Sequence, residues 1–350
     1  MRIVVDVMSG DNSPSELIRG VCAAAKETEG VEYTLVGDEA KIRAEAEANG
    51  LDISSFCIVH AEQVITMEDD PICVTRAKAN SSMSVGLKLL ANGEGDAFVS
   101  AGNTGALFTG ASLIVRRAAG VRRAAIAALL PMDPPVLLLD SGANISVTPE
   151  YLEQFAVMGS AYMKKIHGID SPRVGLLNNG AEAVKGTELQ KEAYKILGES
   201  GLINFVGNVE ANMITRDTCD VLVTDGFTGN ILLKTVEGVG KMMLGVMKNL
   251  FYVNLKTKIA GLFVKSHANA IKKKYDPKEH GGAPILGIAK PVIKAHGSSD
   301  ARAFKNAIKQ AIFCAENRVT DEISGDMTAL LEFRKEKKKM AKTEDTEVDA

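Results

Sequence analysis

The chain has 350 residues, 46% of them hydrophobic and 24% charged, which is typical of a globular protein with one large domain or two linked ones. Its net charge of −3 excludes a protein that binds nucleic acid over its whole surface. The apolar runs are too short to cross a bilayer, and the five cysteines lack a metal or disulfide spacing, so we expect a protein of the reducing cytosol.

Short apolar runs alternate with amphipathic stretches along most of the chain. We expect strands at 2–7, 32–36, 56–60, 97–100, 125–130, 136–140, 173–178, 203–206, 221–225 and 285–294. We expect helices that start at Ser13 and at Asp38, and further helices at about 81–92, 104–118, 149–167, 187–199 and 299–323. This alternation predicts an α/β architecture with a mostly parallel sheet, in which ligands bind beyond the carboxyl ends of the strands.

The segment 227–275 departs from this alternation, because it has a helical pattern without a strand. No acidic residue lies between Glu237 and Asp276, whereas eight lysines do. The pattern predicts a basic amphipathic hairpin for docking on anionic lipid or an acidic protein, and it equally fits a helix pair that forms a dimer or covers the core. The candidate surface residues are Lys256, Lys258, Leu262, Phe263 and Lys265. We expect one catalytic domain over 1–333 and a disordered charged tail over 334–350.

Three polar turns follow predicted strands and open predicted helices: Gly102-Asn103-Thr104-Gly105, Asp225 to Asn230, and His296-Gly297-Ser298-Ser299. Free backbone N–H groups at a helix start attract anions. We therefore expect one anion site that is assembled from distant segments. Further candidates are Ser82 at a helix start, Asn144 and Asn178 after strands, and Lys185 in the loop that follows Asn178.

Several common mechanisms are excluded by missing motifs. The chain has no dinucleotide-binding glycine fingerprint, no P-loop, no serine-hydrolase elbow and no zinc spacing. Neutral donors with one or two cations suit phosphate, and they also suit the oxyanion of acyl transfer. No activated nucleophile is evident, which favours an incoming substrate as the attacking group. Taken singly, Lys185 also fits a surface lysine, Asp225 a helix cap and His296 a structural histidine.

At these motifs the chain resembles the bacterial phosphate acyltransferase family of the PlsX type, over about residues 1–325. The matching segments include Asp6 to Pro14, Ser81-Ser82-Met83, Ser100 to Ala106, Leu138 to Asn144, Gln154 to Tyr162, Arg173 to Asn178, Phe205 to Glu210, Asp225 to Asn230, Tyr275-Asp276-Pro277, Gly281 to Pro284 and His296 to Arg302. One residue and one loop differ from the family pattern. Ser9 stands where the family usually has glycine, and the loop 179–186 has fewer glutamates, with Glu182 remaining.

The resemblance implies a three-layer α/β/α sandwich, related to phosphate acetyltransferases and to isocitrate- and isopropylmalate-type dehydrogenases. It implies a homodimer without an organic cofactor, and the residues themselves indicate no metal site. It also implies a cytoplasmic protein, peripherally associated with the membrane, that makes acyl phosphate from acyl-acyl carrier protein and inorganic phosphate in phospholipid synthesis. A membrane-bound glycerol-3-phosphate acyltransferase would use that acyl phosphate.

On this basis we expect phosphate to attack the carrier thioester directly. The helix-start amides of 103–105 and Lys185 would hold the phosphate, and donors near Asp225 to Asn230 or Gly297 to Ser299 would stabilise the oxyanion. His296 would at most protonate the leaving thiolate. The acidic carrier protein would dock on the lysines of 248–274 or on Arg116, Arg117, Arg122 and Arg123. Two alternatives are a metal-dependent decarboxylating dehydrogenase of the same architecture and a non-enzymatic carrier-protein or membrane scaffold.

Overall fold

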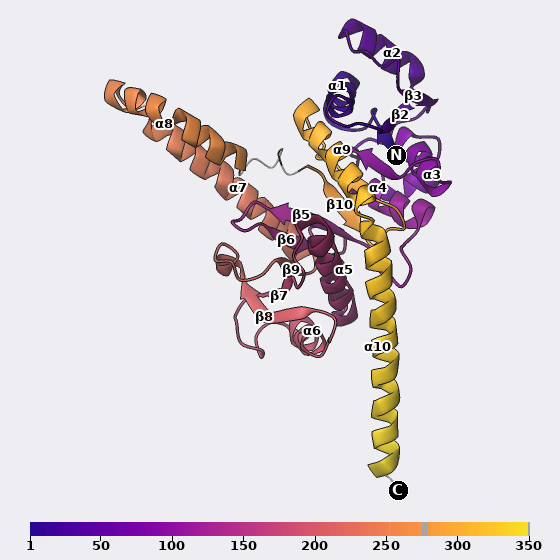
Figure 1. The fold of residues 1–350 in the computed structure, drawn as a ribbon, viewed down its shortest axis with the longest axis vertical. Helices are drawn as coiled ribbons and strands as arrows, with labels where there is room; N and C mark the ends of the chain where they lie inside the picture. The colour runs from indigo at the N-terminus through magenta and orange to yellow at the C-terminus, as the bar shows by residue number, and fades with distance from the viewer. Residues whose placement is uncertain (252, 275–278, 280, 349–350) are drawn as a thin grey trace.

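The structure is a computed structural model that describes residues 1–251, 253–274, 279 and 281–348 (Figure 1). Within the helices, the side chains of Leu255, Leu262, Ser266, 268–274 and 341–348 lie outside this description. The candidate Leu262 is therefore placed only by its backbone, and the motif Tyr275-Asp276-Pro277 falls outside the described residues.

One sheet of eleven strands runs through the molecule, in the order β3-β2-β1-β4-β11-β10-β5-β6-β9-β7-β8. The first parallel group is β3 (Cys57–His60), β2 (Glu32–Gly37), β1 (Arg2–Asp6), β4 (Ala97–Ser100) and β11 (Val292–Lys294). The second is β6 (Val136–Leu139), β9 (Val221–Val223), β7 (Arg173–Asn178) and β8 (Asn204–Glu210). β10 (Ala283–Leu286) and β5 (Ala125–Leu130) join the groups.

Three successive antiparallel pairings, β11 with β10, β10 with β5 and β5 with β6, separate the two parallel groups. As a consequence, the carboxyl ends of the two groups point in opposite directions along the sheet. The single strand predicted over 285–294 is wrong, because the chain reverses there between β10 and β11. Gly287 makes this turn possible with a φ of 85°, a conformation that residues with a Cβ rarely adopt.

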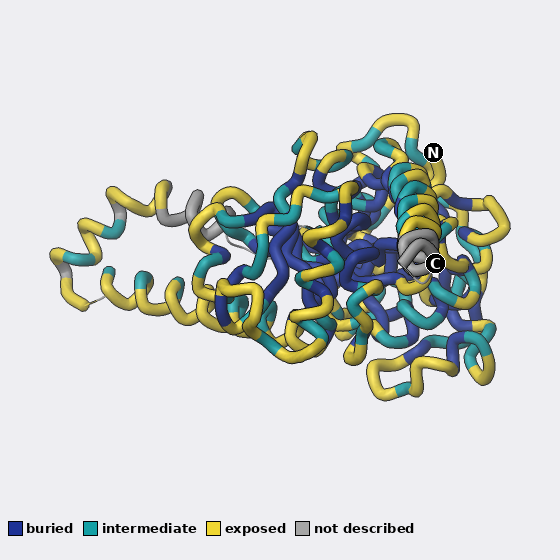
Figure 2. Tube along the Cα trace, turned by 90° about the horizontal axis from the view of Figure 1, so that it is seen from below, coloured by how far each residue is buried: buried dark blue, intermediate teal, exposed yellow. Residues whose placement is uncertain are grey.

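Helices cover both faces of the sheet, which confirms the predicted α/β fold. One face packs on α1 (Pro14–Ala25), α2 (Glu39–Ala48), α5 (Pro149–His167), α6 (Glu188–Gly198), α9 (Ala301–Glu316) and the first turns of α10 (Val319–Val348). The other face packs on α3 (Ser82–Ala91) and α4 (Thr104–Gly110) at the first strand group, and on α7 (Gly226–Leu250) at the second. Figure 2 shows the buried strands at the centre of these layers.

Two predicted helices end earlier than their hydrophobic pattern suggests. The helix predicted over 104–118 passes at Gly110 into a π-helical turn, Ala111–Val115, and stops at Arg116, where φ is 73°. The helix predicted over 299–323 breaks at Arg318, where φ is 52°, and so divides into α9 and α10. Positive φ at a non-glycine residue is uncommon, and these two positions carry no sequence signal that would mark it.

The charged tail is helical as far as Val348, whereas the sequence predicted disorder over 334–350. Two ion pairs attach this part of α10 to the body of the protein. Arg334 pairs with the buried carboxylate of Glu153 on α5, and Lys337 Nζ lies 2.6 Å from Glu199 Oε2, after α6. No helix in the described part of the chain is both long and apolar enough to cross a membrane.

The predicted hairpin is present as α7 and α8 (Leu255–Lys274), and it projects from the body (Figure 1). Figure 2 shows most of its described length as exposed. Its apolar side chains are not covered within this chain, since Met242 is 59% exposed, Leu250 60% and Phe263 80%. The lysines 256, 258 and 265 are exposed on α8. The hairpin therefore presents an apolar surface that no described part of this chain covers.

Candidate functional site

A buried carboxylate, Asp6, organises the polar loops at the carboxyl ends of β1 and β4. Its Oδ1 accepts hydrogen bonds from the N–H groups of Met8 (3.1 Å) and Ser9 (3.3 Å). Its Oδ2 accepts one from Ser100 Oγ at 2.8 Å, and Ser100 Oγ accepts one from the N–H of Gly102 at 3.1 Å. The loops after β1 and β4 are therefore fixed to each other before any ligand binds. The Ser9 hydroxyl is buried there without a hydrogen-bond partner among the described residues.

Asn103 holds a neighbouring loop rather than presenting a free amide. Its Oδ1 caps α4 by accepting from the N–H of Ala106 at 3.0 Å. Its Nδ2 donates to the carbonyls of Thr66, Met67 and Asp69 at 3.0–3.2 Å. Since both amide hydrogens are engaged, the expected role of the Asn103 side chain as a phosphate ligand is not supported by this geometry.

The two residues that follow Asn103 lie in the first turn of α4. Thr104 is exposed, and Gly105 packs so closely on Pro71 that a Cβ would lie 2.7 Å from Pro71 Cγ. Ser82 starts α3 and is fully buried, with its N–H donated to the carbonyl of Gln63 at 3.0 Å. Of these candidates, Thr104 is the one with an exposed side chain at the end of β4.

His296 sits in the exposed loop after β11, and its tautomer is fixed by its neighbour. The N–H of Ser298 donates to Nδ1 of His296 at 3.2 Å, and Ser298 Oγ lies 2.9 Å from the same nitrogen. The neutral ring therefore has its proton on Nε2. Desolvation by the surrounding loops, and then the nearby cations of Lys234 and Lys294, lower the pKa of His296 from its ordinary 6.5. At neutral pH the ring is an uncharged hydrogen-bond donor through Nε2.

The His296 loop contacts the loops after β1 and after β3. The N–H of Asp11 donates to the Gly297 carbonyl at 2.9 Å, and Asn12 Nδ2 donates to the carbonyl of the buried Ser299 at 2.9 Å. A Cβ on Gly297 would lie 2.9 Å from Met67 Cε. Glycine at this position allows the loop around Met67, which Asn103 holds, to approach the histidine loop. These contacts assemble loops from four distant parts of the sequence.

Lys294 is a buried cation that the sequence analysis did not select. Its ammonium donates to the carbonyls of Ala101, at 3.3 Å, and Ala295. Burial lowers its pKa to about 8; the carboxylates of Asp11 and Asp6 oppose this shift, and the cation of Lys234 adds to it. A lysine inside an apolar strand, two residues before His296, was the available signal, because burying an ammonium costs free energy and groups perturbed in this way are frequent at functional sites.

The start of α7 is pressed against the loop after β6. Asp225 caps the helix by accepting from Thr228 N at 2.8 Å and Thr228 Oγ at 2.7 Å. Asn230 Nδ2 donates to the carbonyl of Ser141 at 3.1 Å. Gly229 is required by this packing, because a Cβ there would overlap the carbonyl oxygen of Asp140. The capping interpretation of Asp225 is thus confirmed, and a catalytic role for it stays a prediction.

Asp140 organises the loop 141–144 as Asp6 organises the loop after β1. The fully buried carboxylate accepts from the N–H of Asn144 at 2.7 Å and from its Nδ2 at 2.8 Å, and also from Ile126 N at 3.1 Å. Burial raises the pKa of Asp140, and these hydrogen bonds oppose the shift. Asn144 in turn connects this loop to α7 and to Arg123. Its carbonyl accepts a hydrogen bond from Gly226 N at 2.7 Å, and its Oδ1 accepts one from Arg123 Nε at 2.8 Å.

Lys234, which the sequence analysis also missed, connects the two groups of loops. It lies four residues after Asn230, on the same face of α7. Its ammonium pairs with Glu237 at 2.9 Å and lies close enough to His296 and Lys294 to lower the pKa of both. Along one turn of α7, Asn230 therefore contacts the loop 140–144 and Lys234 approaches the His296 loop. The helix α7 therefore links a loop of the second strand group to a loop of the first.

Lys185 lies in the loop that follows β7. Its carbonyl accepts from Asn178 Nδ2 at 3.2 Å, and its side chain is exposed. Asn178 Oδ1 accepts from the next N–H, that of Asn179, at 2.8 Å. Within the described residues, no hydrogen bond joins Lys185 or Asn178 to Asn103, His296 or Lys234. Their part in the site stays a prediction.

The described residues give no support to a metal site. Asp217 and Asp220, two acidic residues close together in the sequence, both pair with Arg173, and Asp220 Oδ1 lies 2.9 Å from its guanidinium. No group of three or more potential ligands gathers within the part of the chain that the structure describes. Burial raises the pKa of Cys219 to about 11 and that of Cys314 to about 12, so both thiols hold their protons at neutral pH.

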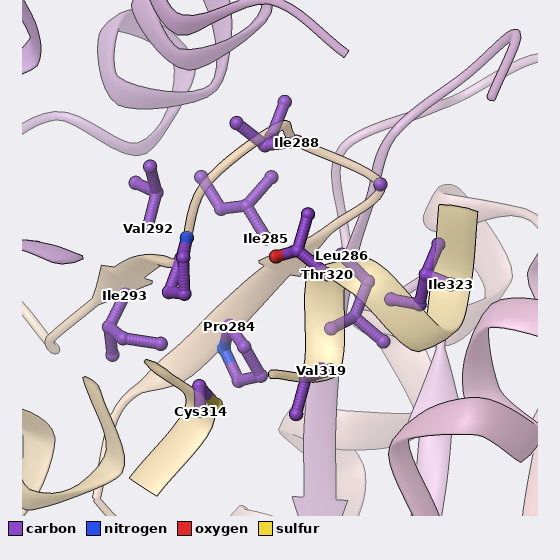
Figure 3. Close-up of a pocket in the computed structure, with 12 residues that line it drawn as sticks. Pro284, Ile285, Leu286, Ile288, Val292, Ile293, Cys314, Val319, Thr320 and Ile323 are labelled. Atoms are coloured by element: carbon purple, nitrogen blue, oxygen red, sulfur yellow. The ribbon is translucent and has the colours of Figure 1, made fainter. Parts of the chain in front are cut away.

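Two cavities lie away from these loops. Figure 3 shows the residues that line a small apolar pocket between β10, β11 and the α9–α10 junction, among them Leu286, Ile293 and Cys314. This pocket has a volume of about 10 Å³. It is too small for a ligand and belongs to the core. A polar cavity of about 480 Å³ lies beside α5, lined by Lys164, Asp170 and Asp326. It opens near the start of β7 and β8, at the opposite end of these strands from Asn178.

Comparison with known proteins identifies the family. A family model described as "Fatty acid synthesis protein" matches residues 1–322. A phosphate acyltransferase of Acetivibrio thermocellus is 48% identical over 324 residues, covering 92% of this chain and 95% of that protein. One from Clostridium acetobutylicum is 42% identical over 331 residues, covering 94% of this chain and 100% of that protein. The chain belongs to the phosphate acyltransferase family.

Membership of the phosphate acyltransferase family makes the chain an acyltransferase, and it favours neither the dehydrogenase nor the scaffold alternative. Solved structures agree on the fold. A phosphotransacetylase from Streptococcus pyogenes superimposes with a TM-score of 0.60 at 18% identity, covering 92% of this chain and 94% of that one. A branched-chain phosphotransacylase from Enterococcus faecalis gives 0.58 at 16% identity, covering 90% and 99%. The predicted relation to phosphate acetyltransferases is thereby confirmed for the fold.

Proposed function

We propose that this phosphate acyltransferase transfers an acyl group from acyl carrier protein to inorganic phosphate and so forms acyl phosphate for phospholipid synthesis. The observation that supports the reaction most directly is that Lys294 and the Nε2–H of His296 lie near Lys234 of α7. Two cations and a neutral donor suit a dianionic nucleophile and a developing oxyanion.

In the proposed reaction a phosphate oxygen attacks the thioester carbonyl carbon. The carbonyl oxygen takes up negative charge, the C–S bond then breaks, and a thiolate leaves. Because a thiolate is a competent leaving group, a strong acid is not required. His296 is neutral and has its proton on Nε2, so it would donate a hydrogen bond to the oxyanion or the departing sulfur rather than transfer a proton outright.

The phosphate would bind where the cations meet the first turn of α4. Backbone N–H groups at Thr104 and Gly105 and the hydroxyl of Ser298 complement Lys294 and Lys234 there. We retain Lys185, Asn178, Asp225 and Asn230 as proposed participants from the second strand group, where Asn230 lies one helical turn from Lys234. Ser82 and Ser299, both buried, would act by shaping the loops.

The hairpin α7–α8 supports a peripheral membrane location and a homodimer as parts of the same proposal. Its exposed apolar residues, such as Met242, Leu250 and Phe263, need a cover, and the lysines of α8 suit an anionic surface. A second copy of the hairpin or a lipid surface would provide that cover. A membrane-bound glycerol-3-phosphate acyltransferase would then receive the acyl phosphate.

The function is tested by incubating the protein with acyl-acyl carrier protein, with and without inorganic phosphate. Free thiol should be released only with phosphate, and hydroxylamine should trap an equal amount of acyl phosphate as the hydroxamate. Thiol release that is indifferent to phosphate would show a thioesterase instead, and no release in either case would contradict the proposal.

A further inference from the structure

A cluster of arginines lies beside the proposed site, in the segment that joins the π-helical turn to β5. Arg116, Arg117, Arg122 and Arg123 are all exposed. None of them forms an ion pair within the described residues, whereas Arg2, Arg43 and Arg173 each pair with a carboxylate. Four exposed guanidinium groups without paired carboxylates form a positively charged surface that would attract an anionic partner.

Neutral groups hold three of these arginines in place. Arg117 donates through a guanidinium nitrogen to the carbonyl of Arg122 at 2.8 Å. The Arg122 guanidinium lies over the ring of Tyr151, 5.6 Å from its centroid, and Arg123 Nε donates to Asn144 Oδ1 at 2.8 Å. Side chains ordered before binding lose less conformational entropy when a partner arrives. The cluster is therefore organised for binding rather than merely solvated.

The cluster is coupled to the proposed site through two buried residues. Arg123 contacts Asn144, which is 2% exposed, and Asn144 contacts both Asp140 and the first residue of α7. Asn230 follows on the same helix, one turn before Lys234. A partner bound at the arginines would thus lie next to the start of α7, from which the polar face of the helix leads to the His296 loop.

We infer that Arg116, Arg117, Arg122 and Arg123 form the docking surface for the acidic acyl carrier protein. This inference rests on the proposed function and adds the surface by which the substrate is recognised. The other basic surface, on α8, fits this role less well. Lys256 and Lys258 lie beyond the far end of α7 (Gly226–Leu250), so about 24 Å of helix separates them from Lys234, whereas Gly226, which Asn144 contacts, lies about 12 Å from Lys234 along the same helix. A carrier docked there would hold its thioester far from the His296 loop.

Exposed apolar residues flank the arginines and suit a protein partner. Leu113, in the π-helical turn, is 56% exposed, and Ile145, next to Asn144, is 75% exposed. Protein interfaces combine a small apolar contact with surrounding charges, and the charges chiefly set the rate and specificity of association. Free phosphate would not need these apolar residues.

The test compares a protein substrate with a small one. In the double variant Arg117→Glu/Arg122→Glu, the KM for acyl-acyl carrier protein should rise at least tenfold at low salt, and the difference should shrink at high salt. The kcat/KM for an acyl-pantetheine thioester, which has the reacting group without the protein, should stay within twofold. The charge-retaining variant Arg117→Lys/Arg122→Lys should recover most of the carrier affinity.

A matched variant and a binding measurement separate the possible failures. Lys256→Glu/Lys258→Glu has the same charge change on α8 and should leave the carrier KM unchanged. The inference is overturned if this control raises the carrier KM and the arginine variant does not, or if the arginine variant weakens both thioesters equally. Calorimetric titration with carrier protein lacking an acyl group tests the surface independently of turnover. Wild-type binding that the arginine variant loses would support the surface even if no acyl phosphate forms.

Discussion

Ser298 donates its backbone N–H to Nδ1 of His296 at 3.2 Å, and this contact fixes the proton of the neutral imidazole on Nε2. Protonation of Nδ1 would break the contact and loosen the loop that binds Asp11 and Asn12. The neutral form is therefore the one that keeps this loop contact, and it persists below the ordinary histidine pKa because desolvation and two cations lower the value.

Changing Lys234 should move the titration of His296. Lys234→Met removes a nearby positive charge that disfavours the imidazolium, so the pKa of His296 should rise toward 6.5. The acid limb of the pH–kcat profile should shift to higher pH in the same variant. The NMR titration of the imidazole measures the first effect, and His296→Gln, which removes the titrating group, is the control that assigns the limb. A pKa unchanged by Lys234→Met would place Lys234 away from the histidine.

Deprotonation of Lys294 should produce the alkaline limb of the pH profile of kcat/KM for phosphate. Because burial holds its pKa at about 8, the ammonium loses its proton as the pH rises through that value, and kcat/KM for phosphate should fall. Lys294→Met fills a similar volume, and it should lower kcat/KM at neutral pH at least tenfold, about 1.4 kcal/mol, and remove the limb. Steady-state kinetics across pH 8 measure both effects. Persistence of the limb in the variant would assign it to another group.

The same lysine also makes a prediction for stability. Its pKa is lower in the folded protein than the ordinary 10.5, so the unfolded chain binds more protons between about pH 8 and 10.5. The contribution of this group to the free energy of unfolding therefore rises with pH over that window, and below it the buried charge destabilises the fold. Urea unfolding on both sides of pH 8 should show this rise for wild type and a flatter profile for Lys294→Met.

Lys185→Ala tests whether the second strand group takes part in catalysis. If Lys185 binds phosphate or the oxyanion, phosphate-dependent turnover should fall at least tenfold, about 1.4 kcal/mol of transition-state stabilisation. Lys191→Ala is the matched control, because Lys191 is an exposed lysine nearby that pairs with Glu188 at 2.9 Å. Equal activity of the two folded variants would remove Lys185 from the site.

The hairpin should bind anionic membranes through both charge and apolar contact. Changing Lys256, Lys258 and Lys265 to Glu should release the protein from anionic vesicles at low salt, since each lysine near such a surface contributes about 1 kcal/mol. Phe263→Asp should weaken binding at low and high salt alike, because apolar burial is not screened by ions. Co-sedimentation measures both. If neither change alters it, the hairpin is a dimer or core element.

The fold was predictable where the local structure of a residue depends on its neighbours in the sequence. Strand–helix alternation gave the layers, and the capping residues Asp38 and Asp225 stand where helices begin. The division of 285–294 into two strands was not evident, because an apolar run does not show which way the chain turns at Gly287. The positive φ of Arg116 and Arg318 likewise depends on contacts with distant segments.

The sequence indicated which loops form the candidate site, but not which atoms in those loops are free to bind a ligand. The sequence placed Asn103 and His296 in loops that do meet, but it could not show that the Asn103 amide is engaged by three carbonyls. Lys234 and Lys294 were missed for the converse reason. Each looks ordinary in its own helix or strand, and each becomes distinctive only when α7 is laid beside the His296 loop.

The place of β10 and β11 in the sheet has a consequence for how the chain is built during synthesis. These strands come late in the sequence, yet β11 completes the hydrogen bonding of β4, and β10 that of β5. Until residues 283–294 leave the ribosome, both earlier strands are unpaired edges of the kind that recruit other chains. A nascent protein truncated before Ala283 should therefore aggregate rather than fold as two halves, and the final assembly should be slow because it joins distant segments.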